Sequence, residues 1–239
     1  MIRLDISHLS WQLNKSFKIS RGSKNTAETI EVKLTDDKFI GIGECVPYGR
    51  YDETLESVQK EILELKDGIE NLEINKKNLD QFINNGAARN AIDCALWDLE
   101  SKKKKESVWS MLDIQKPQEI PSSYTVVLDD PDKMIEDIYG HREFPTIKIK
   151  VDNKNLDRIL TNARESLPNT TIIVDANESF EVDDLNKNIE YIRSIKPLVA
   201  FHDFDGNEQG FRMTHLAMER TSNMMIENAL LAVKNNDIK

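Results

Sequence analysis

The chain has 239 residues, of which 39% are hydrophobic and 31% are charged, a balance typical of a folded globular protein rather than a disordered one. Its 42 acidic residues outnumber its 32 basic residues, and the net charge of −10 argues against nucleic acid as a partner because phosphates need a basic surplus. No run approaches the roughly 18 apolar residues that span a bilayer, so no membrane association is expected.

The amino terminus and the cysteines bear on the cell compartment. The first residues lack the charged-then-apolar layout of a secretory signal peptide. Cys45 and Cys94 are too few for a disulfide framework, and we predict that both are packed as small hydrophobic side chains. The sequence therefore predicts a cytoplasmic protein of one or two domains.

The first part of the chain predicts strands followed by helices. Apolar residues alternate around 2–6, 30–34 and 39–43, with Asp36-Asp37 as the turn before the last segment, which predicts an antiparallel meander.

Three helices are predicted next, because the apolar spacing changes to a period of 3.6. The first is expected to end at Asp67-Gly68, the second covers 77–83, and the third follows Gly86. The third helix presents a narrow face of small side chains that lets another backbone approach closely, formed by Ala88, Ala91, Ala95 and Leu99. Residues 1–118 are thus predicted to form an α+β domain.

The pattern changes after residue 118. Four strand-like segments, SSYTVVL, TIKIKV, TIIVD and LVAF, alternate with three helix-like segments, PDKMIEDIYGH, NLDRILTNARESL and DDLNKNIEYIRSI. This alternation is typical of right-handed parallel crossovers, and the apolar strands indicate a sheet with both faces covered. A closed barrel and a doubly wound sheet both fit the pattern.

Two lysines lie on the second of these strands. Lys148 and Lys150 are two residues apart, so both side chains point to one face, opposite Ile147 and Ile149. Ammonium groups in the middle of a buried strand must serve a site or pair with acids, and their mutual repulsion favours a neutral amine that can act as a base. The alternative is an edge strand that carries two solvated lysines.

The third strand ends at Asp175, which Asn177 and Glu178 follow. The carboxyl ends of parallel strands are where α/β folds bind ligands, and Mg²⁺ prefers carboxylate oxygens. Asp175 is therefore a candidate metal ligand. The alternative is an aspartate that caps a helix or makes a turn.

Six stretches carry a family resemblance, namely ISRGSKNTAETIEVKL, GIGECVPYGRYDET, ARNAIDCALWDLESK, YTVVLDDPDKM, IKIKV and IIVDANESF. In this order they resemble the enolase superfamily, its muconate-lactonising subgroup, and within it the dipeptide (L-Ala-D/L-Glu) epimerases. The resemblance implies that residues 1–118 are a capping domain and that residues 119–203 form a partial (β/α) TIM-type barrel of about three βα units plus a fourth strand.

The resemblance also implies a chemistry, the abstraction of a proton α to a carboxylate, with Mg²⁺ stabilising the ene-diolate. Lys150 would be the base, Lys148 would hold the substrate carboxylate, and Asp175 would bind Mg²⁺. Arg21 would meet the side-chain carboxylate of a Glu-containing dipeptide, and Thr125 would contact the bound dipeptide. The alternatives are a solvated loop cation for Arg21 and an ordinary strand residue for Thr125.

The match stops after the fourth strand. Residues 121–239 suffice for about four βα units at roughly 30 residues each. The family's metal-binding Glu-Gln-Pro motif, its next aspartate, its second lysine and its final acidic pair have no counterparts, although Asp203 or Asp205 could replace the glutamate. Residues 204–239 predict a helical tail without a family match, which is expected to cover the open edge of the sheet.

Two functions remain open. The first is a Mg-dependent isomerase that epimerises a small-molecule dipeptide through an enolate. Its turnover would be weak or absent in a chain shortened by truncation, a frameshift or a split gene, because epimerisation needs a second base on the other face. The second is an inactive family member that acts as a binding or assembly module, for instance a homo-oligomer paired through the open edges.

Overall fold

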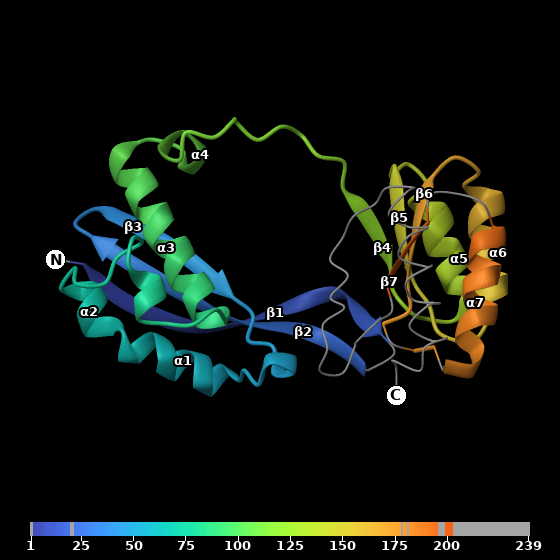
Figure 1. Cartoon of the computed structure of the whole chain (residues 1–239), viewed down its shortest axis with the longest axis horizontal. Helices are drawn as coiled ribbons and strands as arrows, with labels where there is room; N and C mark the ends of the chain where they lie inside the picture. The colour runs from blue at the N-terminus through green and yellow to red at the C-terminus, as the bar shows by residue number, and fades with distance from the viewer. Residues whose placement is uncertain (1, 20–21, 178, 181, 196–198, 203–239) are drawn as a thin grey trace. The chain divides into compact units, whose positions relative to one another are not determined.

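A computed structural model describes residues 2–19, 22–177, 179–180, 182–195 and 199–202 (Figure 1). The chain divides into two compact units, the first made of residues 1–14 and 25–119 and the second of residues 15–24 and 120–239. In the described ranges, no helix combines the length and the apolar composition that a membrane span requires.

Some predictions lie outside the described residues. These are the roles of Arg21, Glu178, Asp203 and Asp205 and the helical tail over residues 204–239.

The first unit contains a three-stranded sheet in the order β1-β2-β3, as the alternating apolar residues predicted. Its strands are β1 (Arg3–Ile19), β2 (Gly22–Asp36) and β3 (Phe39–Cys45). β2 and β3 are antiparallel, and the predicted turn between them is confirmed, with Asp37 in a left-handed conformation at φ 54°. Leu4, Ile30 and Leu34 are fully buried on the face that makes the core.

Short and long helices follow the sheet. They are η1 (Gly49–Tyr51), α1 (Leu55–Glu64), α2 (Lys66–Glu70), η2 (Leu79–Gln81), α3 (Ala87–Lys104) and α4 (Val108–Met111). A capping box starts α1, because the Thr54 side chain accepts from the Ser57 backbone N–H while the Ser57 side chain accepts from that of Thr54.

Two helix predictions in this unit were wrong. Asp67-Gly68 lies inside α2 and does not end a helix, because the Asn71 backbone N–H donates to the Asp67 carbonyl oxygen at 2.9 Å and continues the helical hydrogen bonds. The helix predicted over 77–83 is only the 3-10 turn η2. There the Asn78 side chain accepts from the Asn75 backbone N–H at 2.8 Å, a local bond that competes with helix formation.

The small-residue face of α3 packs directly on β3, as its composition predicted. Gly43 faces the helix so closely that an added Cβ would lie 1.9 Å from the Ala91 carbonyl oxygen, and one at Gly41 would lie 2.2 Å from that of Ala95. Cys45 is buried as predicted, whereas Cys94 is exposed, because it lies on α3 outside the buried Ala91 and Ala95 face.

The second unit contains a four-stranded parallel sheet in the order β4-β5-β6-β7. Its elements alternate as predicted: β4 (Ser123–Val126), α5 (Pro131–Gly140), β5 (Thr146–Lys150), α6 (Leu156–Ser166), β6 (Thr171–Asp175), α7 (Val182–Ser194) and β7 (Val199–His202). The helices lie side by side on one face of the sheet, α5 against α6 and α6 against α7 (Figure 1). Consecutive strand order with helices on one face is the arrangement of a partial (β/α) barrel and excludes the doubly wound sheet.

The α3–β3 contact yields a stability prediction. A Gly43→Ala variant should lower the free energy of unfolding by about 3 kcal/mol, because the methyl group would overlap backbone atoms that cannot rotate away. Urea unfolding can be followed by tryptophan fluorescence, since Trp11, Trp97 and Trp109 all belong to the first unit.

Gly49→Ala is the matched control, because nothing lies within 4 Å of a Cβ added at Gly49. Equal stabilities of the two variants would contradict the close backbone contact.

Candidate active site

Strand β5 separates an apolar face from a charged face, as its alternation predicted. Ile147 and Ile149 are fully buried in the core of the second unit, while Lys148 and Lys150 point to the opposite face. The strand pairs with β4 on one side and with β6 on the other. The interpretation of an edge strand with two solvated lysines is therefore wrong.

The two lysines meet at one carboxylate. Lys150 Nζ lies 2.6 Å from Asp175 Oδ2, and Lys148 Nζ lies 2.7 Å from the same oxygen. Asp175 is 1% exposed and Lys150 is 7% exposed. Register explains the convergence, because Lys150 pairs with Asp175 across the β5–β6 ladder, and registered residues of parallel strands point to the same face.

The loop after β6 adds an amide to the cluster. Asn177 Oδ1 accepts a hydrogen bond from Lys150 Nζ at 2.7 Å, and the Asn177 backbone N–H donates to Asp175 Oδ1 at 3.1 Å. Asn177 takes the left-handed conformation, at φ 48°, that directs its side chain back toward the strand end. The Asp175 carboxylate therefore accepts a turn hydrogen bond from Asn177 and also pairs with the two lysines.

Thr125 lies level with the lysines on the neighbouring strand. It pairs with Lys148 across the β4–β5 ladder and is half-buried, whereas Val126, one residue on, is fully buried on the other face. The structure therefore brings Thr125, Lys148, Lys150 and Asp175 to one face of the sheet near the strand ends, and their catalytic roles stay proposals.

Phe17 was not predicted from the sequence. It belongs to the β1–β2 segment of residues 15–24 that is part of the second unit, and its ring centroid lies 5.9 Å from Lys150 Nζ, at the outer limit of a cation–π contact. No local pattern marks Phe17, because the contact joins residues far apart in the sequence.

The described residues alone do not make a magnesium site. Within them, no group of three His, Cys, Asp or Glu side chains is placed to hold a metal. Asp175 offers a single carboxylate, and its Oδ2 already accepts from two ammonium groups. Because Mg²⁺ requires near-octahedral oxygen coordination, further ligands would have to come from outside the described residues.

Comparisons with known proteins agree with this fold. Residues 1–113 match the family described as mandelate racemase / muconate lactonizing enzyme, N-terminal domain. A βα partial barrel follows that domain in this chain, with the lysine pair on its second strand. Residues 1–113 are thus similar to the N-terminal domain of that family, and the chain is similar to proteins of the enolase superfamily.

Two similar proteins are an epimerase and a racemase. The L-Ala-D/L-Glu epimerase of Escherichia coli K12 is 34% identical over 178 residues, which are 74% of this chain and 55% of that protein. The N-acetyl-D-glutamate racemase of a Pseudoalteromonas species is 34% identical over 183 residues, which are 73% of this chain and 57% of that protein. The chain thus spans little more than half the length of these relatives.

A solved structure extends the comparison to three dimensions. It is an enolase family member from Agrobacterium tumefaciens with homology to dipeptide epimerases, solved with bound sodium and L-Ala-L-Glu. The identity is 34% and the TM-score is 0.78, over 83% of this chain and 61% of that chain.

The buried cluster yields a second stability prediction. Asp175→Asn should lower the free energy of unfolding of the second unit by roughly 3–5 kcal/mol, because two ammonium groups lose the carboxylate that offsets their desolvation. Lys148→Met should cost much less, since the pairing of Lys150 with Asp175 remains. Urea unfolding followed by far-UV circular dichroism measures both changes.

Lys133→Met is the control, because it removes only an exposed pairing with Asp129 at 3.6 Å. An Asp175→Asn protein as stable as the control would show that the buried pairing does not stabilise the fold.

Proposed function

We propose that the chain carries the first half of a dipeptide epimerase site, in which an amine on β5 removes the proton α to a carboxylate. The observation that carries the proposal is the convergence of Lys148 and Lys150 on Asp175 at the strand ends. Isomerases of this superfamily use a lysine or histidine base close to Mg²⁺, so a lysine beside a buried carboxylate supports the proposal.

The charges of the cluster support an anionic substrate. Lys148 and Lys150 bring two ammonium groups to the same end of the sheet. An ammonium group there can pair with a substrate carboxylate. Lys148, whose side chain is 18% exposed against 9% for Lys150, is the better placed of the two to receive it.

Lys150 is the base in this proposal. Its amine donates to Asp175 and to Asn177, and both contacts fix the position of the nitrogen near the strand end. A proton acceptor needs a free lone pair, so Lys150 acts as a base in its neutral form.

The substrate class rests on the relatives. Dipeptides ending in glutamate fit the Escherichia coli epimerase and the L-Ala-L-Glu found in the Agrobacterium tumefaciens structure. Thr125, level with Lys148, would contact the dipeptide backbone, and Arg21 would bind the glutamate side chain. Mg²⁺ at Asp175 would stabilise the enolate charge, with its remaining ligands supplied from outside the described residues.

A binding or assembly module without turnover is the second candidate. It is favoured by the position of Lys148 and Lys150 on one strand, because epimerisation also requires a proton donor on the other face of the α carbon. The site would then bind a carboxylate ligand without converting it.

Deuterium exchange distinguishes the two functions. The purified chain is incubated with L-Ala-L-Glu and Mg²⁺ in D₂O, and the glutamate α proton is followed by NMR. Loss of that signal without formation of the D-epimer is expected, because the described residues place one lysine pair, on one strand, at the site. Lys150→Met should slow the exchange by about 100-fold or more, the range that general-base catalysis contributes.

Lys133→Met controls for the loss of an exposed lysine from the same unit. Absence of exchange in folded wild-type protein would contradict the epimerase proposal and favour the binding module.

A further inference from the structure

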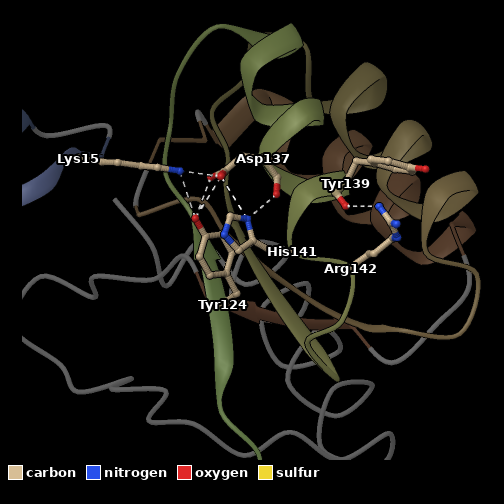
Figure 2. Close-up of polar contacts among 6 residues, drawn as sticks. All are labelled: Lys15, Tyr124, Asp137, Tyr139, His141 and Arg142. Atoms are coloured by element: carbon tan, nitrogen blue, oxygen red, sulfur yellow. Dashed lines mark hydrogen bonds and ion pairs between the residues drawn. The ribbon is translucent and has the colours of Figure 1, made fainter.

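A polar cluster joins the tip segment of the β1–β2 hairpin to β4 and α5 within the second unit (Figure 2). Lys15 Nζ donates to Asp137 Oδ1 at 2.7 Å and to the Tyr124 hydroxyl at 3.3 Å, and that hydroxyl donates to Asp137 Oδ1 at 3.1 Å. Each of the three side chains thus contacts the other two. We call Lys15, Tyr124 and Asp137 the hairpin clasp.

The acceptor side of the clasp also has contacts that do not involve Lys15. His141 Nδ1 lies 2.9 Å from the Asp137 carbonyl oxygen and 3.3 Å from its carboxylate Oδ1. The His141 ring stacks on the Tyr124 ring, with centroids 3.6 Å apart and planes 8° apart (Figure 2). Tyr124 and Asp137 therefore form a rigid acceptor on the barrel, and the flexible partner is the long side chain of Lys15.

The contact also favours the charged form of Lys15. The hydrogen bond to Asp137 raises the pKa of Lys15 above its ordinary value, so the ammonium group stays protonated at neutral pH. The Asp137 side chain is 16% exposed, which screens the pairing less than a fully solvated position would.

Lys15 of the hairpin clasp lies two residues before Phe17 on β1. The two side chains therefore point to the same side of that strand. One residue beyond, the Lys18 carbonyl oxygen accepts from the Leu128 backbone N–H at 3.3 Å, a second attachment of the hairpin to the barrel. Phe17, between these two attachments, places its ring 5.9 Å from Lys150 Nζ.

We propose that the hairpin clasp is a positioning device that holds Phe17 over the Lys150 amine, so that Lys15, Tyr124 and Asp137 control access to the base. The proposal rests on the role of Lys150 in the proposed function. Lys15 is 60% exposed at its side chain, and exposed pairings contribute little to stability, so the expected effect of the clasp is on the position of Phe17 rather than on folding.

The test measures the accessibility of Lys150 directly. The whole chain is treated briefly with acetic anhydride, and mass spectrometry compares acetylation of Lys150 with that of Lys148, the internal reference on the same strand. Lys15→Met and Asp137→Asn should each raise the Lys150 to Lys148 ratio by about 3-fold to 10-fold. Lys15→Arg should keep the wild-type ratio, because a guanidinium group can also pair with Asp137.

Two further variants sharpen the result. Phe17→Ala should raise the ratio as much as Lys15→Met, and the double variant should add nothing more, because both changes act through one ring. Lys133→Met, which removes an exposed pairing from the same helix, should leave the ratio unchanged. A wild-type ratio in Lys15→Met and Asp137→Asn would overturn the proposal, as would additive effects of Lys15→Met and Phe17→Ala.

The same variants separate this proposal from the proposed function. If the clasp positions Phe17 for the reaction, Lys15→Met should also slow α-deuteration of L-Ala-L-Glu by several-fold, with Lys15→Arg restoring the rate. A raised acetylation ratio without deuteration in any protein would support the clasp and contradict the epimerase. Deuteration with an unchanged acetylation ratio would support the epimerase and contradict the clasp.

Discussion

The main buried electrostatic interaction described in the barrel unit is the pairing of the Asp175 carboxylate with Lys148 and Lys150. The carboxylate is almost fully buried, and two ammonium groups approach the same oxygen within 2.7 Å. Ions in such a position are costly to desolvate, and only mutual attraction and hydrogen bonds offset that cost. The Asn177 side chain accepts from Lys150, and its backbone N–H donates to Asp175. Stability and the proposed chemistry therefore depend on the same atoms, because perturbed ionisable groups tend to cluster at functional sites.

Much of this arrangement follows from the sequence by simple rules. The period of two along TIKIKV places Lys148 and Lys150 on one face, and the alternation of strands and helices places Asp175 on the adjacent parallel strand. The sequence pattern does not distinguish a barrel from a doubly wound sheet, because both folds share the same alternation of strands and helices. The strand order and the single-sided helices settle it.

Other features could not be predicted because they depend on contacts between distant segments. Lys15 and Asp137 are 122 positions apart, and no periodicity links them. Phe17 contacts Lys150 across a similar separation. A local rule also failed at Gly68, which lies within a helix and packs against Ile74, although glycine usually marks a helix end.

The contact between α3 and β3 has a consequence for how the first unit can diverge. Two glycines on the strand face two alanine carbonyls on the helix with no room for a single methyl group. A larger side chain at Gly41 or Gly43 would require the helix to shift as a whole, since its backbone is what stands in the way. A substitution at either glycine therefore requires a change in the position of α3. Relatives in which the helix lies as close to the strand should have glycine at both positions.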